Sequence, residues 1–372
     1  MKILHISKFY PPYRGGIEDV CYNIVHGITD VEQKVMCFNH TSTTEIFEID
    51  NVEIIRVGII TELAQQPISF SYFFWLKKYI KKFSPDIIHL HLPNPLVCFY
   101  ILLLLPIQTK LLLHWHSDIV AQKFIYRLIY PLEKKILKRA NKIIITSPNY
   151  LEKSGPLSAF FNKIEVVPNM ISLDKISTVE DIDKKVQNLC SLYNNKDIVF
   201  FMGRHVPYKG IEYLLEAEKY ISADCIILIA GSGPLTEQLK KNNRSPRVKF
   251  VGRIPDEEIK VYMTAASVFA FPSITKNEAF GVVLAEAMYC KATPVTFKIE
   301  GSGVNWVSLK DVTGLEVENK NSKLFGEAID RLLHDELLRC NLAEQGYRRV
   351  VENFTMDSIQ QKLKLIYNEL TS

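Results

Sequence analysis

The sequence predicts an α/β protein made of two doubly wound, parallel-sheet domains. Short apolar segments alternate with amphipathic, helix-like segments, and this alternation occurs twice along the 372 residues. Strands of a parallel sheet are covered by helices on both faces and are therefore apolar throughout, as residues 225–230 are. A polar stretch at 177–195 separates the two series and is expected to be a linker with a short helix. A chain of this length also favours two domains over one.

The first series predicts seven strands and three helices. The strands are expected at 3–7, 34–38, 52–57, 87–90, 110–114, 142–147 and 164–167, and the helices at 17–28, 71–83 and 122–139. The longest apolar run, 96–107, is too short to span a bilayer and is expected to be a core helix. Residues 1–6 read as a first strand and not as a signal peptide, so a cytoplasmic location is expected.

The second series predicts five strands, four connecting helices and three final helices. The strands are expected at 198–202, 225–230, 248–251, 268–271 and 293–297, the helices at 209–220, 234–241, 256–265 and 280–289, and the final helices at 322–334, 337–353 and 357–370. We therefore predict a first Rossmann-like domain at 1–170 and a second at 171–354. The helix at about 355–372 is expected to pack back on the first domain. Ligands would bind in a cleft between the domains, beyond the carboxyl ends of the strands.

Composition and charge narrow the functional classes. Hydrophobic residues make up 47% of the chain, which argues against disorder. The seven cysteines form no C-x-x-C pair and are expected to be free thiols in a reducing compartment. Residues 71–142 hold 12 Lys+Arg against 3 Asp+Glu, interleaved with aromatic side chains. This segment suits an anionic membrane surface, although a core helix with a solvated lysine face is also consistent with it. No nucleic-acid-binding motif is present.

The segment 277–288 points most clearly to chemistry. It places Glu278 and Glu286 eight positions apart, around a Phe280-Gly281 step that opens a helix. A helix start carries unpaired N–H groups and partial positive charge, so it suits a phosphate. If every step were helical, the two carboxylates would be separated by a rise of roughly 12 Å. A diphosphate with a ribose at one end and a sugar at the other, as in a nucleotide-sugar, would fit between them.

Three further motifs follow expected strands. Residues 203–210 place Arg204 and Lys209 at a helix start, where two neighbouring cations would bind an anion between them. Gly15 and Gly16 follow the first strand and would let backbone approach a ligand, although an ordinary turn explains them equally well. Gly231, in 229–234, either lines a nucleotide pocket or belongs to a tight turn. None of these is a dinucleotide-binding G-x-G-x-x-G fingerprint.

Four histidines fall at the ends of two expected strands. His89 and His91 share one strand face, and His114 and His116 share another. These pairs lack nearby thiol or well-placed carboxylate ligands, so no metal site is expected. His89 and His114 are expected to be structural and to hydrogen-bond the backbone. His116, nearest to a strand's carboxyl end, is the candidate for the cleft.

Together these residues resemble the retaining family-4 glycosyltransferases, which have the GT-B fold. The resemblance covers nearly the whole chain and rests on Glu278 and Glu286, on Arg204 and Lys209, on the Gly15-Gly16 loop and on His116. Residues 116–123, 147–150 and 300–303 look especially like bacterial O-antigen mannosyltransferases that use GDP-mannose. The chain departs from the family at 289–291, where many relatives have a glycine, and at 168–171, where relatives often have Asn-Gly-hydrophobic-Asp.

The resemblance implies transfer of a hexose, with mannose favoured, from a nucleotide-sugar to a hydroxyl group, with retained anomeric configuration. Arg204, Lys209 and the helix start at Phe280-Gly281 would stabilise the diphosphate without metal, and Glu286 would bind the ribose. Glu278 and His116 would contact the sugar. Gly15, Gly16 and Gly231 complete the expected donor site. The donor would be GDP-mannose, or alternatively a UDP-sugar, with no separate cofactor.

The same resemblance implies an acceptor bound mainly by the first domain. This acceptor would be a glycan or a lipid-linked saccharide of O-antigen or capsule synthesis, used at the inner face of the plasma membrane. Two alternatives remain open. A nucleotide-sugar epimerase or a glycan phosphorylase would share the fold, and a non-catalytic protein would only bind the sugar-nucleotide.

Overall fold

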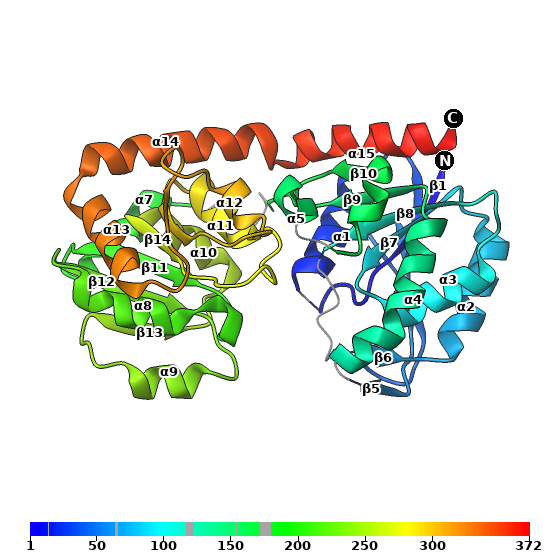
Figure 1. The fold of residues 1–372 in the computed structure, drawn as a ribbon, viewed down its shortest axis with the longest axis horizontal. Helices are drawn as coiled ribbons and strands as arrows, with labels where there is room; N and C mark the ends of the chain where they lie inside the picture. The colour runs from blue at the N-terminus through cyan, green and yellow to red at the C-terminus, as the bar shows by residue number, and fades with distance from the viewer. Residues whose placement is uncertain (14, 64–65, 117–122, 153–154, 172–179) are drawn as a thin grey trace. The chain divides into compact units, whose positions relative to one another are not determined.

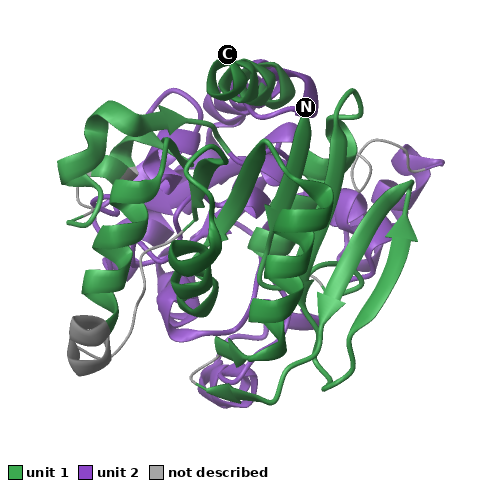
Figure 2. Cartoon of the chain, turned by 90° about the vertical axis from the view of Figure 1, so that its right-hand side faces the viewer, with its two compact units in different colours: residues 1–168, 359–372 green, residues 169–358 purple. Residues whose placement is uncertain are grey.

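The computed structural model describes residues 1–372 except 14, 64–65, 117–122, 153–154 and 172–179 (Figure 1). The chain divides into two compact units. Unit 1 comprises residues 1–168 and 359–372, and unit 2 comprises 169–358 (Figure 2). The chain therefore leaves unit 1 near residue 168 and re-enters it with its last helix. Both termini lie in unit 1.

Unit 1 is built on an eight-stranded sheet with the order β10-β9-β8-β7-β1-β2-β4-β3. Its strands are β1 (Lys2–Ile6), β2 (Glu32–Phe38), β3 (Glu45–Ile49), β4 (Val52–Val57), β7 (Ile87–Leu92), β8 (Lys110–Trp115), β9 (Lys142–Ile145) and β10 (Ile164–Val166). All neighbours pair in parallel except β3, which runs antiparallel to β4. The sequence did not predict β3 because this edge strand lacks a continuous apolar run. The short hairpin β5 (Thr61–Leu63) and β6 (Gln66–Ile68) was also missed.

The helices of unit 1 lie on both faces of this sheet. Helix α1 (Gly16–Gly27) packs its Cys21 and Val25 over β2 and β4. The chain then crosses back along the sheet, and right-handed crossovers place α2 (Ser71–Phe83), α3 (Pro95–Leu104) and α4 (Lys123–Arg139) on the other face. Short segments α5 (Pro148–Glu152) and η1 (Ser158–Lys163) follow, and α15 (Met356–Thr371) ends the chain. In the described ranges, no helix combines the length and apolar character needed to cross a bilayer.

Unit 2 is a Rossmann-like domain. Its six-stranded sheet has the order β13-β12-β11-β14-β15-β16, with all neighbours parallel. The strands are β11 (Asp197–Met202), β12 (Cys225–Ala230), β13 (Val248–Gly252), β14 (Val268–Phe271), β15 (Thr293–Phe297) and β16 (Leu315–Val317). In chain order this is 3-2-1-4-5-6, so the direction of winding reverses between β11 and β14. The sequence did not predict β16, which has only three residues.

The helices of unit 2 largely occupy the predicted segments. They are α7 (Ile182–Leu192), α8 (Ile211–Ala217), α9 (Thr236–Asn242), α10 (Ile259–Ala265), α11 (Val282–Tyr289), α12 (Val304–Val307), α13 (Ser322–His334) and α14 (Glu336–Asn353), with the single-turn segments η2 (Pro207–Lys209), η3 (Glu218–Tyr220) and η4 (Asp256–Glu258). The predicted helix 209–220 is therefore interrupted. Gly210 breaks it near its start, with a left-handed φ of 60°.

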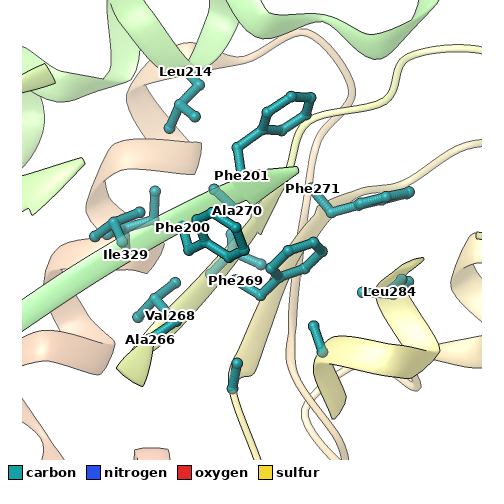
Figure 3. Close-up of a cluster of buried hydrophobic side chains, with 14 of the residues drawn as sticks. Phe200, Phe201, Leu214, Ala266, Val268, Phe269, Ala270, Phe271, Leu284 and Ile329 are labelled. Atoms are coloured by element: carbon teal, nitrogen blue, oxygen red, sulfur yellow. The ribbon is translucent and has the colours of Figure 1, made fainter. Parts of the chain in front are cut away.

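The central strands of unit 2 carry an aromatic core. Phe200 and Phe201 on β11 and Phe269 and Phe271 on β14 are all completely buried, and the rings of Phe200 and Phe269 lie 6.0 Å apart (Figure 3). Leu284 on α11 joins the same cluster. Burying a large apolar side chain stabilises a fold by about 1.5–3 kcal/mol. The two strands that reach the switch point, and the helix that follows β14, are thus held by one packed core.

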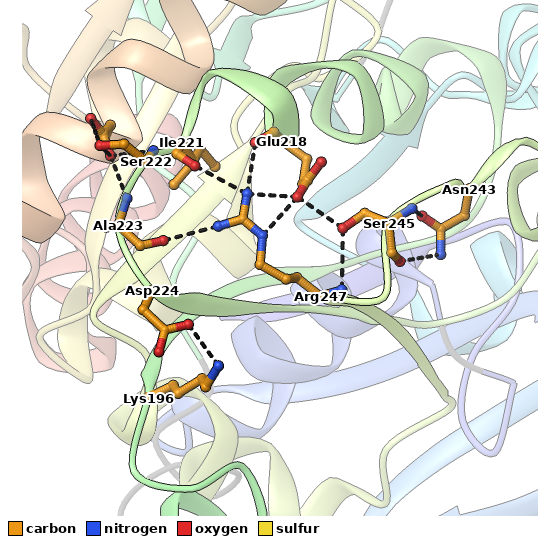
Figure 4. A network of polar contacts seen from close by, with 10 residues as sticks. Lys196, Glu218, Ile221, Ser222, Ala223, Asp224, Asn243, Ser245 and Arg247 are labelled. Carbon is orange, nitrogen blue, oxygen red and sulfur yellow. Dashed lines mark hydrogen bonds and ion pairs between the residues drawn. The ribbon is translucent and has the colours of Figure 1, made fainter.

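A polar network fixes the opposite, amino-terminal end of the sheet (Figure 4). The guanidinium of Arg247 donates to the backbone carbonyls of Glu218, Ile221 and Ala223 and to the carboxylate of Glu218. These groups lie just before β12 and β13 begin. Arg247 therefore satisfies the carbonyls left open where η3 ends, at the edge of the sheet remote from the carboxyl ends of the strands.

The exit of α11 contains a residue in the left-handed conformation. Lys291 takes a left-handed φ of 63°, a conformation that glycine adopts without strain. Its side chain forms an ion pair of 2.8 Å with Glu344.

Candidate functional site

The topology of unit 2 selects one place for a ligand. In an open parallel sheet the loops on either side of the switch point diverge, and a crevice opens at the carboxyl ends of the strands. Here the switch point lies between the paired strands β11 and β14. The loop after β11 carries Arg204 and Lys209, and the loop after β14 carries Glu278. Three residues predicted from two separate motifs therefore belong to the two loops that flank one switch point.

Lys209 and Glu278 form an ion pair at this point. The Nζ atom of Lys209 donates to Oε2 of Glu278, and the side chains are only 9% and 13% exposed. Nζ also lies 5.0 Å from the centre of the Phe271 ring. A buried ion pair costs desolvation of both partners, so breaking it by removing one of them leaves an expensive unpaired charge. The sequence placed these residues in one site but did not predict their direct contact.

Glu278 is held by two serines. Oγ of Ser273 donates to the Glu278 carboxylate at 3.3 Å, and Oγ of Ser302 donates to its backbone carbonyl. The next peptide is held as well, since the Gly303 N–H donates to the Ala279 carbonyl at 2.9 Å. The segment 300–303, which the sequence singled out only by its resemblance to O-antigen mannosyltransferases, therefore holds the backbone of Glu278 in place. The direct contact of Ser273 was missed, because no motif distinguishes this serine.

Two glycines allow the loops of the site to pack backbone against backbone. A Cβ atom on Gly210 would lie 2.2 Å from the Pro272 carbonyl oxygen, and one on Gly231 would lie 2.0 Å from that of Gly203. Both glycines also have positive φ. The tight-turn interpretation of Gly231 thus has a structural reason. Its predicted contact with a nucleotide stays a prediction.

Helix α11, which carries Glu286, starts two residues later than predicted. Helix α11 begins at Val282, and Gly281 is its N-cap with a left-handed φ of 89°. Phe280, predicted as the first helical residue, is buried before the helix and contacts Phe354, with ring centres 5.3 Å apart. The premise of eight helical steps between Glu278 and Glu286 is therefore wrong. Glu286 lies inside α11 and is partly buried, while Arg204 is exposed on the loop after β11.

In unit 1, the paired glycines begin α1. Gly15 is the N-cap, and its carbonyl accepts from Asp19 N–H at 2.9 Å. A Cβ atom on Gly15 would lie 2.4 Å from a Glu18 carboxylate oxygen, whereas one on Gly16 would meet no atom within 4 Å. Burial raises the pKa of Glu18, although backbone hydrogen bonds and Lys8 oppose the shift. The open space beside Gly16 allows a substitution there that tests whether a ligand contacts this loop.

We expect Gly16→Ala to leave stability within about 0.5 kcal/mol of the parent, because the added methyl group has room. If the donor lies against this loop, the same methyl group lowers kcat/KM for the donor at least about tenfold. Thermal melting and initial rates measured on one preparation separate the two effects. Gly155→Ala, which also adds a methyl group into open space, is the matched control. Unchanged rates in Gly16→Ala would exclude close approach of the donor there.

Five histidines form an array on one face of the unit 1 sheet. His5 on β1, His89 and His91 on β7, and His114 and His116 at the end of β8 face the same side because these strands are neighbours in register. His89 Nε2 lies 3.3 Å from His114 Nδ1, and His91 Nδ1 lies 2.9 Å from His116 Nε2. In each pair the rings are nearly coplanar, with angles of 8° and 9°. His114 and His116 stack with ring centres 4.2 Å apart.

The expectation that His89 and His114 hydrogen-bond the backbone is wrong. They bond each other, and Nδ1 of His89 contacts Oη of Tyr367 on α15 at 2.7 Å. The register of the neighbouring strands brings these side chains together, and the sequence of a single strand does not reveal such contacts. Burial lowers the pKa of His5 to about 4 and that of His116 to about 3. It also lowers the pKa of His89, His91 and His114 well below the usual value. The array is therefore neutral at physiological pH.

Among the described residues, two groups place potential metal ligands within 4.8 Å of one another: His89, His91 and His114, and His5, Cys21 and His91. In the first group the facing nitrogens of His89 and His114 already bond each other. The prediction that no metal is needed stays a prediction.

Comparisons with known proteins agree with this fold. Residues 14–175 match the family model Glycosyltransferase Family 4, and residues 184–349 match the model Glycosyl transferases group 1. The O-antigen chain mannosyltransferase C of Escherichia coli is 27% identical, over 100% of this chain and 99% of its own length. D-rhamnosyltransferase WbpZ of Pseudomonas aeruginosa is 26% identical, over 88% of this chain and 86% of its own.

Solved structures show the same fold over the whole chain. Sucrose-phosphate synthase from Thermosynechococcus elongatus has a TM-score of 0.79 at 22% identity, covering 99% of this chain and 98% of that one. HepE of Anabaena, in complex with UDP and glucose, has a TM-score of 0.76 at 19% identity and covers 99% and 100%.

Two Rossmann-like units with these sheet orders define the GT-B fold. The chain belongs to the glycosyltransferases, with its first half matching the Family 4 model and its second half the group 1 model.

Proposed function

We propose that this glycosyltransferase moves mannose from GDP-mannose to a hydroxyl group of a glycan or lipid-linked acceptor, with retained anomeric configuration and without metal. The observation that carries the proposal is the Lys209–Glu278 pair at the switch point of unit 2. Relatives named for O-antigen and capsular polysaccharide synthesis support a role in making a bacterial surface polysaccharide. Structures of HepE with UDP and with UDP-glucose support a nucleotide-sugar as the donor and leave a UDP-sugar as the alternative.

The residues of unit 2 have complementary chemical roles in this proposal. Departure of the leaving group concentrates negative charge on the diphosphate, and Arg204, Lys209 and the start of α11 stabilise that charge. Glu286 binds the ribose hydroxyls, and Glu278 binds hydroxyls of the sugar. The ion pair also has a consequence for binding. Because Lys209 is already neutralised by Glu278, the anion gains most of its net attraction from the exposed Arg204.

The proposed reaction keeps the sugar's configuration through attack on the face that the leaving group departs from, with the leaving phosphate as base. His116 of unit 1 contacts the transferred sugar. Exclusion of water protects the donor from hydrolysis. A covalent intermediate, as in retaining hydrolases, is the alternative route.

Thermal shift against GDP-, UDP- and dTDP-sugars tests the donor directly, because a ligand that binds the folded state raises the melting temperature. GDP-mannose is expected to give the largest shift. Incubating the stabilising donor without acceptor distinguishes an epimerase, which would form an epimerised nucleotide-sugar. No shift with any sugar-nucleotide would contradict the proposed function.

We further propose that unit 1 docks on an anionic membrane surface through α2 and α3. Helix α2 buries Tyr72, Leu76, Tyr79 and Phe83 and exposes Lys77, Lys78, Lys81 and Lys82. Beside these lysines, Phe74 is 69% exposed, and Leu103 on the neighbouring α3 is 60% exposed. Exposed apolar groups next to a cluster of lysines suit the boundary between headgroups and acyl chains.

We expect Lys77→Glu/Lys81→Glu to weaken binding to anionic vesicles at least about tenfold, since each surface lysine contributes about 1 kcal/mol. Sedimentation with phosphatidylglycerol vesicles measures this, and raised salt should release the parent protein. Lys240→Glu/Lys241→Glu, on the exposed surface of α9 in unit 2, is the matched control for charge. Equal loss in both variants, or binding that salt does not change, would contradict docking through α2.

A further inference from the structure

A hydrogen bond within the histidine array determines which ring nitrogen of His116 carries the proton. Nε2 of His116 bonds Nδ1 of His91 at 2.9 Å, and both side chains are buried. The N–H of His116 donates to the Leu92 carbonyl at 3.2 Å, and the His116 ring stacks on that of His114. The backbone N–H, the Nε2 edge and one face of the His116 ring are therefore each in contact with a neighbouring group. Of the two ring nitrogens, only Nδ1 is left for a ligand among the described residues.

A bond between two neutral imidazoles contains one proton, so it can be made in two ways. If His91 donates from Nδ1, His116 carries its own proton on Nδ1. If His116 donates from Nε2, its Nδ1 is a lone pair, and His91 must carry its proton on Nε2. The arrangement therefore decides whether His116 offers a ligand a hydrogen-bond donor or an acceptor.

The second nitrogen of His91 decides between them. His91 Nε2 is buried and has no hydrogen-bond partner among the residues that the structure describes. Orphaned buried N–H groups are rare and costly in native proteins, whereas an acceptor left without a donor is tolerated more often. The arrangement that leaves a lone pair at His91 Nε2 is therefore favoured, and in it His91 donates to His116.

His5 in the same array supports this rule independently. The Gln33 amide is oriented by its Nε2, which donates to the Val25 carbonyl at 2.9 Å and to the Ile28 carbonyl. Its Oε1 must then accept from His5 Nε2 at 2.9 Å. The remaining nitrogen, His5 Nδ1, is buried without a partner in the described part of the chain and has to be a lone pair. At His5, where the hydrogen bonds determine the tautomer, the ring nitrogen without a partner is thus the unprotonated one.

We propose that His91 is a positioning residue, which donates from Nδ1 to His116 and holds His116 as the Nδ1–H tautomer, so that His116 presents a hydrogen-bond donor to an oxygen of the transferred sugar. The tautomer is inferred from the hydrogen bonds of the array alone. Only the statement that the accepting oxygen belongs to a transferred sugar rests on the proposed function. His116 then cannot serve as a general base through Nδ1. It selects donors that carry an accepting oxygen at that position.

Nitrogen NMR of the full-length protein with 15N-labelled histidine tests the tautomer without any substrate. His116 signals are assigned by their loss in His116→Asn. The expected result is a protonated Nδ1 and an unprotonated Nε2 for His116. A protonated Nε2 in the parent protein would overturn the proposal, whatever the enzyme's activity.

Two variants at position 91 test the positioning role. Asn carries an N–H near the place of the histidine Nδ1–H, so His91→Asn is expected to keep the tautomer and to stay within about threefold of the parent in kcat/KM for the donor. His91→Leu removes the donor, and we expect a mixture of His116 tautomers and a loss in kcat/KM of at least about tenfold. A pure Nδ1–H tautomer in folded His91→Leu would show that His91 does not set it. If no sugar-nucleotide is used at all, the proposed function fails while the NMR result stands.

Discussion

Removing either partner of the Lys209–Glu278 pair is expected to lower kcat/KM at least about tenfold, which corresponds to about 1.4 kcal/mol of transition-state stabilisation. Lys209→Ala removes a cation from the proposed diphosphate site, and Glu278→Ala removes the proposed contact with the sugar. Both side chains are nearly buried at the switch point. Steady-state rates with the donor identified by thermal shift measure the effect.

A loss of activity by itself does not separate chemistry from folding, because each single variant leaves one buried charge unpaired. Each should lose stability, by about 3–5 kcal/mol if the remaining charge stays desolvated. The double variant Lys209→Ala/Glu278→Ala should recover part of that stability and none of the activity. Lys196→Ala, which breaks the exposed 2.6 Å ion pair with Asp224, is the control and should change rates less than about twofold. Near-normal rates in both single variants would refute the site.

Mild acid is expected to destabilise unit 1. Its five array histidines are buried and neutral, and burial holds their pKa values below the 6.5 of an exposed imidazole. Below pH 6.5 the unfolded chain binds protons at these side chains that the folded chain does not, so stability falls as pH falls. Each histidine costs about 1 kcal/mol between pH 6.5 and 5.5, so the five cost about 5 kcal/mol. That is a large share of the 5–15 kcal/mol that typically stabilises a domain, about a third or more.

The loss should continue as pH falls toward the folded-state pKa of about 4 for His5. Glu18 acts in the opposite direction, because burial raises its pKa. Urea unfolding at pH 7.5, 6.5 and 5.5, with hydrogen exchange followed in peptides from β1, β7 and β8, measures the effect in unit 1. Peptides from β11 and β12 of unit 2 serve as the internal reference. His5→Gln should reduce the loss of stability between pH 6.5 and 5.5 by about 1 kcal/mol. Stability that does not change between pH 7.5 and 5.5 would contradict a neutral, buried array.

The parts of the site that the sequence predicted are those with local signals. A strand followed by glycine and a cation, or by an acid at a helix start, is visible within about ten residues, and topology then brings such loops together. The contact between Lys209 and Glu278 joins residues 69 positions apart, and that between His89 and Tyr367 joins residues 278 apart. Such contacts depend on register and packing, which a single segment does not encode.

The start of α11 and the edge strand β3 could not be predicted from the sequence for a similar reason. The start of α11 at Val282, and not at Phe280, follows from the packing of Phe280 against Phe354 and from the left-handed Gly281. Helix ends are set by such competing contacts more than by propensity. Strand β3 was missed because an exposed edge strand lacks the apolar run by which buried parallel strands are recognised.

We propose that unit 2 binds the diphosphate of a sugar-nucleotide at the point where β11 and β14 end. A crystal structure with GDP-mannose is the sharpest test. We expect the diphosphate within hydrogen-bond distance of Arg204 and Lys209, beside the start of α11, with Glu286 on the ribose and Glu278 on the mannose. A diphosphate bound elsewhere, with Arg204 and Lys209 directed into solvent, would contradict it.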